Sequence, residues 1–277
     1  MYDWLTEHKI PLGLWVKQGM DALTQNSGGA FDAVTLVLGT LIDGFTGLLL
    51  AMPPMLAIAA AAIGTWLVHR RIGLAVFVLL SLLLIVNLGY WKETMQTLSL
   101  VTCATIVCVL IGVPLGIAAA HRPALYAALR PILDLMQTIP TFVYLIPTLV
   151  LFGLGTVPGL ISTVIFALPA PVRLTHLGIS SVPTPLHEAA LAFGASRSQH
   201  LFKVELPAAM PTIMAGVTQC IMLCLSMVVI AALVGADGLG KPVVRALNTV
   251  NLAMGFEAGA CIVILAINLD RVFRRPE

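Results

Sequence analysis

The chain has 277 residues, of which 59% are hydrophobic and 10% charged, and its net charge is +2. A soluble domain carries roughly 25% charged residues, because its surface must meet water. The composition therefore excludes a soluble globular protein and a disordered segment, and the small net charge gives no reason to expect a nucleic-acid partner. We expect an all-α integral membrane protein with the lipid bilayer as its solvent.

Residues 1–47 differ from the rest of the chain. Between residues 31 and 48, apolar side chains recur at helical spacing, and Asp32 and Asp43 lie largely off that apolar stripe. This pattern predicts an amphipathic helix that lies along the membrane surface in an external N-terminal tail. The alternative is an additional membrane span, which Asp43 and several glycines disfavour.

Residues 48–277 are assigned to one transmembrane domain. A spanning helix needs about 20 mostly apolar residues. Segments of about that length suggest seven spans, at 48–68, 72–90, 96–120, 132–153, 158–179, 210–234 and 252–269.

The distribution of Lys and Arg predicts the orientation of these spans. Ten basic residues fall on one side of the seven-span topology: Arg70, Arg71, Arg122, Arg130, Arg173, Arg197, Lys203, Arg271, Arg274 and Arg275. Five fall on the other side: Lys9, Lys17, Lys92, Lys241 and Arg245. Because short cytoplasmic loops carry the basic excess, we expect the N-terminus outside and the C-terminus in the cytoplasm.

The longest predicted cytoplasmic loop contains a segment that resembles a docking element. Residues 186–195 predict a short helix, with Glu188 near its first turn and Gly194 at its end. Ala189 and Ala190 leave a low surface that another protein can approach closely. From the residues alone, an ordinary helix that caps the bundle is an equal alternative.

This loop resembles the EAA loop of ABC-importer permeases, which reads E-A-A, three residues, G, nine residues, I or V, one residue, L-P. The matching positions are Glu188, Ala189, Ala190, Gly194, Val204, Leu206 and Pro207. In that family the loop forms the coupling helix that sits in a groove of the cytoplasmic ATPase. The resemblance implies that residues 186–207 contact such an ATPase, with Val204 standing where Ile is commoner.

Four further stretches narrow the resemblance to permeases of choline, glycine betaine and proline betaine importers. They are residues 136–147, 166–171, 206–216 and 262–271. The resemblance implies a type I ABC importer permease fold, a homodimer, two ABC ATPase subunits, an external substrate-binding protein and the inner membrane of a bacterium. The chain has no GxxxxGK[ST] phosphate loop, so we expect a non-catalytic subunit without a cofactor of its own, with ATP and Mg²⁺ in the partner ATPase.

The predicted span 132–153 contains a candidate substrate pathway. Pro140 and Pro147 each leave a carbonyl four residues earlier without its helical partner, and such groups are tolerated in a membrane against water or other protein groups. A quaternary ammonium ion has no donor hydrogens and is held best by aromatic faces. The candidate pathway residues are Met136, Gln137, Thr138, Pro140, Phe142, Tyr144 and Pro147. A role in helix packing alone is the alternative for the prolines, and a role in packing or hydrogen bonding is the alternative for Tyr144.

Two further expectations concern charge and metals. An ion-coupled secondary transporter is the alternative function, but it needs ion ligands near the membrane midplane, and the spans offer few carboxylates. His176, His187 and His200 have no spacing typical of metal ligands, so the sequence predicts solvated side chains and no metal site.

Overall fold

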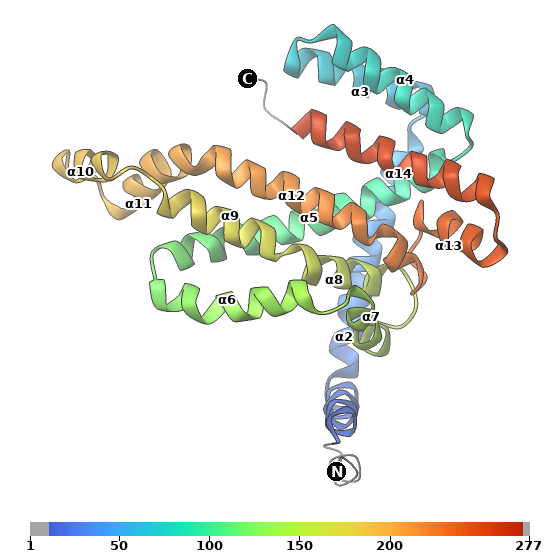
Figure 1. Ribbon diagram of the computed structural model, residues 1–277, viewed down its shortest axis with the longest axis horizontal. Helices are drawn as coiled ribbons and strands as arrows, with labels where there is room; N and C mark the ends of the chain where they lie inside the picture. The colour runs from blue at the N-terminus through green and yellow to red at the C-terminus, as the bar shows by residue number, and fades with distance from the viewer. Residues whose placement is uncertain (1–10, 274–277) are drawn as a thin grey trace, which may run out of the picture.

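The chain forms an all-helical bundle in the computed structural model, which describes residues 11–273. The described part contains no strand. Most of the long helices run side by side along the long axis of the molecule, and the connections between them gather at its two ends (Figure 1). The basic residues Lys9, Arg274 and Arg275, which helped to predict the orientation, lie outside the described residues.

The helices follow one another with short connections. In chain order they are α2 (Leu12–Ala51), α3 (Pro54–His69), α4 (Ile72–Asn87), α5 (Trp91–Ala120), α6 (Pro123–Thr138), α7 (Thr141–Phe152), α8 (Thr156–Ala167), α9 (Pro169–Ser180), α10 (Thr184–Ala192), α11 (Arg197–His200), the π-helical turn η1 (Leu201–Glu205), α12 (Leu206–Ala232), α13 (Gly240–Thr249) and α14 (Leu252–Phe273).

The structure confirms an integral membrane fold, with seven spans as an approximate count. Among the described residues, five helical stretches are long and apolar enough to cross a membrane: Gly28–Ala51, Trp91–Ala120, Thr156–Ser180, Arg197–Ala232 and Leu252–Phe273. The bent pair α6–α7 raises this number to six. Helices α3 and α4 have 16 residues each and are about 24 Å long, shorter than the ~30 Å hydrocarbon core. The predicted set of seven spans results if both short helices and the bent pair cross and α2 does not.

The predicted span over 132–153 is interrupted within the segment. This segment is two helices, α6 and α7, which meet at an angle of 96°. The break falls at Ile139 and Pro140, whose backbones have ψ angles of 131° and 132°. Proline removes an amide donor and pushes the preceding residue out of the helical region, which accounts for the break. Pro147 lies inside α7 without interrupting it.

Helix α2 crosses the predicted boundary at residue 47 and continues to Ala51. It packs on α5, where the Ser99 hydroxyl donates a hydrogen bond to the carbonyl of the buried Ile42 at 3.2 Å. Figure 1 shows α2 crossing the long helices steeply, the direction expected of a helix along the membrane surface. Since its second half is also apolar enough to span, the interfacial placement stays a prediction.

The centre of the bundle is the close packing of α5, α9 and α12. A Cβ atom on Gly116 of α5 would lie 2.7 Å from the carbonyl oxygen of Val172 in α9. A Cβ atom on Gly178 of α9 would lie 3.2 Å from the Cβ of Ala209 in α12. Small residues let helix backbones approach closely, and this packing drives helix association in lipid. The start of α12 is therefore fixed against the rest of the bundle.

Candidate functional site

The segment from Thr184 to Pro207, called here the coupling segment, forms one end of the molecule. Figure 1 shows α10 and α11 at the far end of the bundle from α13, beyond the ends of α9 and α12. Helix α10 ends in a left-handed Gly194, with φ of 72°. The Gly194 and Ala195 amides donate to the carbonyls of Leu191 and Ala190, at 2.9 and 3.0 Å. This is the Schellman arrangement that closes a helix, and it confirms the predicted end of the helix.

The sequence motif places exposed side chains on this segment. Glu188, Ala189, Gly194 and Pro207 are exposed, Val204 and Leu206 are half-buried, and Ala190 is buried. Phe193, which directly precedes the terminating glycine, is 92% exposed. An apolar ring open to solvent at a helix end is a ready contact for another protein. Ala190 packs inward and supports the segment, so it offers little surface for contact.

Glu188 lies directly after the first turn of the helix and not within it. Helix α10 begins at Thr184, two residues earlier than predicted, and its first turn contains no acidic residue. Pro185 occupies an early position, where its missing amide costs little. Glu188 is therefore the fifth residue of the helix. The helix dipole acts mainly on charges in the first turn, so it does not account for a glutamate at this position.

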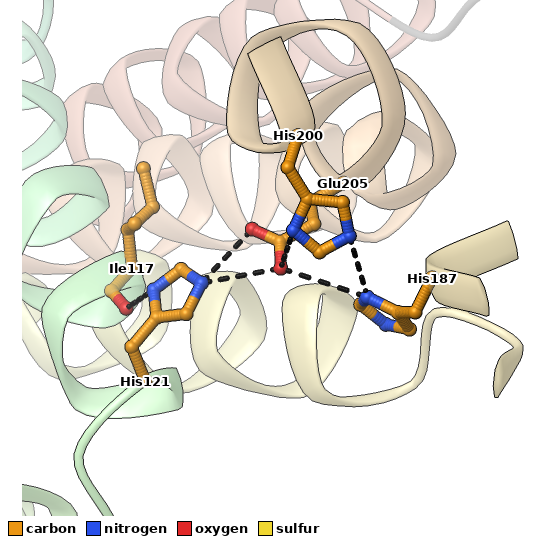
Figure 2. A network of polar contacts seen from close by, with 5 residues as sticks. All are labelled: Ile117, His121, His187, His200 and Glu205. Atoms are coloured by element: carbon orange, nitrogen blue, oxygen red, sulfur yellow. Dashed lines mark hydrogen bonds and ion pairs between the residues drawn. The ribbon is translucent and has the colours of Figure 1, made fainter. Parts of the chain in front are cut away.

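Four polar side chains meet at the base of the coupling segment (Figure 2). The Glu205 carboxylate is 3% exposed, and its Oε2 lies 2.9 Å from Nε2 of His121 at the end of α5. Its Oε1 lies 3.5 Å from Nδ1 of His200, whose Nε2 lies 2.9 Å from Nδ1 of His187 in α10. The network thus joins α10 to the end of α11, to the last residue of η1 directly before α12, and to the end of α5.

The prediction that His187 and His200 are solvated is wrong, because both are half-buried in this network. His176 is not part of it, since its ring stacks on Tyr126 with centroids 3.5 Å apart. The helical periodicity of the sequence gives no signal for the cluster. His200 and Glu205 are five residues apart, a spacing that faces one side in the π-helical turn η1 but not in an α-helix.

The seven candidate pathway residues gather at the bend between α6 and α7. All are exposed or half-buried in the single chain: Met136, Gln137, Thr138, Pro140, Phe142, Tyr144 and Pro147. The Phe142 ring is 57% exposed. The bend therefore offers an aromatic ring and polar side chains on an open face of one copy of the chain, and their contact with a substrate stays a prediction.

Tyr144 has a structural role at this bend. Its hydroxyl donates a hydrogen bond of 2.8 Å to the carbonyl of Met136, the group that Pro140 deprives of its helical partner. The tyrosine was missed because it reaches the carbonyl only when α7 folds back towards the end of α6.

Comparison with known proteins identifies the family. Residues 112–274 match the family described as binding-protein-dependent transport system inner membrane component. The chain is 48% identical, over 95% of its own length and 74% of the other, to the glycine betaine/proline betaine transport system permease protein ProW of Escherichia coli. It is 47% identical, over 95% and 93%, to the glycine betaine transport system permease protein OpuAB of Bacillus subtilis.

Solved structures confirm the fold that the sequence predicted. A chain of the inward-facing MetNI methionine ABC transporter matches 66% of this chain and 95% of its own, with a TM-score of 0.59 and 24% identity. At that identity the likeness concerns the fold alone, which is that of a type I ABC importer permease. The family match covers more than half of the chain, and two relatives are nearly half identical to it. The chain therefore belongs to the family of binding-protein-dependent transport system inner membrane components.

Proposed function

We propose that this chain is the permease subunit of an ATP-driven importer for quaternary ammonium compounds, with glycine betaine as the first candidate substrate. Three relatives that are 47–48% identical over 95% of this chain are named as glycine betaine permeases, with proline betaine or carnitine as a further substrate of some. Choline is the second candidate, since a choline permease of Bacillus subtilis is 34% identical over 58% of this chain.

The proposed assembly contains two copies of the chain, two ABC ATPase subunits and an external substrate-binding protein. The observation that carries it is the coupling segment, which presents the motif residues Glu188, Ala189 and Gly194 at an exposed end of the bundle. The connection between α5 and α6, which contains Arg122, lies at the same end of the bundle, and this supports a cytoplasmic location for it. In the inner membrane this orientation leaves α13 outside. We propose the same side for the N-terminus, as the distribution of basic residues predicts.

The geometry suggests how ATP binding would move the pathway. A docked ATPase contacts the exposed residues of α10, and the hydrogen bond between His187 and His200 joins α10 to α11. From there, η1 runs directly into α12, which packs on α5 and α9 at the centre of the bundle. ATP-driven closure of two ATPases would therefore displace α12 along with α10. The two states of the bundle must differ in contact energy, because ATP binding shifts the equilibrium only by that difference.

The bend between α6 and α7 is the proposed place of substrate passage. Glycine betaine and choline carry a trimethylammonium group, which cannot donate a hydrogen bond and is attracted by aromatic faces, by ~2 kcal/mol when desolvated. Phe142 exposes such a face. Tyr144 adds a second ring, whose hydroxyl reaches the end of α6, where Gln137 and Thr138 are exposed. Two bends, one from each copy, would enclose a path between the two halves of the dimer.

The test is uptake into proteoliposomes that contain this chain, its ATPase subunits and its binding protein. Labelled glycine betaine, proline betaine, carnitine and choline are supplied outside, with ATP or a non-hydrolysable analogue inside. We expect uptake that requires hydrolysable ATP and is unaffected by ionophores that collapse ion gradients. Uptake that persists without ATP and stops with an ionophore would contradict the proposal and favour the ion-coupled alternative.

A further inference from the structure

The side chains at the base of the coupling segment have the composition of a transition-metal site. Among the described residues, His187, His200 and Glu205 each offer one ligand atom, and these atoms all lie within 4.8 Å of one another. They come from three successive elements, α10, α11 and η1. Imidazole nitrogen combined with carboxylate oxygen is a ligand set that suits Zn²⁺.

The distances are close to those that a bound ion requires. Zinc holds nitrogen and oxygen ligands at about 2.0–2.2 Å, so tetrahedral geometry separates the ligand atoms by about 3.3–3.5 Å. The Nδ1 atom of His187 lies 2.9 Å from Nε2 of His200 and 3.9 Å from Oε1 of Glu205. One distance is slightly short and the other slightly long. The third separation, between the ligand nitrogen of His200 and the Glu205 carboxylate, is no more than 4.8 Å, so a bound ion requires the His200 ring to turn towards the carboxylate.

The carboxylate of Glu205 is oriented before any ion arrives. It is buried, and a buried charge is costly unless other groups pair with it. His121 contacts both carboxylate oxygens, at 2.9 and 3.2 Å, while its other ring nitrogen lies 3.0 Å from the Ile117 carbonyl oxygen. His121 thus takes the place of the outer partner that fixes a metal-binding carboxylate in known sites.

We infer that His187, His200 and Glu205 bind a transition-metal ion, with Zn²⁺ as the probe of choice, and that His121 positions the Glu205 carboxylate. The rings of His187 and His200 are partly exposed at the end of the bundle, so an ion can enter from solvent. The bound ion fastens helix α10 to the last residue of η1, directly before α12. It therefore stiffens the element through which the proposed ATPase would act, whereas the binding itself does not depend on the proposed transport.

The test uses the full-length chain in lipid nanodiscs, purified without a polyhistidine tag. Zn²⁺ is titrated against a chromophoric chelator, and Co²⁺ replaces it to report coordination geometry by visible absorption. We expect one ion per chain, tetrahedral Co²⁺ absorption, and a rise in the thermal unfolding temperature with Zn²⁺. His187→Gln and His200→Gln should each weaken binding by about 100-fold or more, and His121→Gln by about 10-fold, as removal of an outer partner does.

His176→Gln is the matched control, because it removes a histidine that stacks on Tyr126 outside the cluster. It should leave the affinity for Zn²⁺ unchanged. Size-exclusion chromatography and circular dichroism select the variants that remain folded, and glutamine keeps a polar side chain of similar length at each position. The inference is overturned if folded wild-type protein binds no Zn²⁺ in a saturable way, or if a folded His187→Gln/His200→Gln double variant binds it as tightly as the wild type.

Discussion

Two glycines show how differently the bundle core and the coupling segment use the same residue. Gly116 lies where α5 meets α9, and a Cβ atom there would lie 2.7 Å from a backbone carbonyl oxygen. Gly194 lies at the end of α10, and a Cβ atom there would meet nothing within 4 Å. Glycine is needed at position 194 because of the backbone conformation. The φ angle of 72° lies in the left-handed region, which other residues rarely adopt.

The two glycines therefore serve different purposes: Gly116 is needed for the chain to fold, and Gly194 is needed for the proposed function. In the core, space is already filled by the chain itself, so a side chain at Gly116 must displace a neighbouring backbone. At the coupling segment, the space beside Gly194 is open, and the proposed ATPase would fill it. Substitutions in the first region should therefore remove folded protein, whereas substitutions in the second should leave folded protein that cannot transport.

The largest effect is expected for Gly116→Leu. The added side chain collides with Val172 and Thr175 of α9, and overpacking of this kind costs about 3 kcal/mol. We expect little folded protein in the membrane fraction, measured by fluorescence size-exclusion chromatography of a tagged chain. Gly64→Leu is the control, because a Cβ atom there meets nothing within 4 Å. Equal yields of the two variants would show that the core does not require the close approach.

Gly194→Trp tests the other side of the comparison. A bulky side chain at the tip of the coupling segment should abolish ATP-dependent uptake while the yield of folded protein stays normal. The left-handed backbone alone costs roughly 1–2 kcal/mol for a residue other than glycine. Gly194→Asn controls for that cost, because Asn tolerates this conformation and is much smaller than Trp. Normal uptake by the Trp variant would show that this end of the coupling segment has no part in coupling to the ATPase.

A pair of substitutions at Tyr144 gives a smaller effect that separates its two roles. Tyr144→Phe removes only the hydroxyl, which donates to the Met136 and Leu135 carbonyls in an interaction worth about 1 kcal/mol, and keeps the ring. Tyr144→Ala removes both. If the ring lines the path, the Ala variant should lose most of its uptake while the Phe variant keeps most of it, in initial-rate assays at equal protein levels. Equal losses in both variants would assign Tyr144 to the structure of the bend.

The smallest effect is expected at the edge of the core, where α4 meets α14. The buried Asn268 donates to the Ser81 hydroxyl at 2.9 Å. Polar pairs between helices in lipid contribute about 0.6 kcal/mol on average. Asn268→Leu should therefore lower the unfolding temperature slightly and leave uptake nearly normal, as measured by thermal shift and transport assays. A complete loss of folded protein would show that this pair matters as much as the contact at Gly116.

Much of the fold follows from features that lie within short stretches of sequence. The apolar runs predicted the long helices, and the motif from Glu188 to Pro207 predicted a short helix closed by Gly194. Pro140 predicted that the helix is distorted within the segment 132–153. The sequence did not predict the 96° angle between α6 and α7. A proline fixes where a helix is interrupted, while the direction of the next helix depends on its packing partners.

The sequence alone determined that the chain lies in a membrane, that it is all-helical, which family it resembles, and that a glycine ends α10. Each of these depends on composition or on residues close together in the chain. Only the tertiary structure decided which distant groups meet. The hydrogen bond from Tyr144 to Met136 needs the bend, and the contact between His121 and Glu205 joins residues 84 positions apart. Helical periodicity describes one helix at a time, so contacts between helices appear only after the bundle has packed.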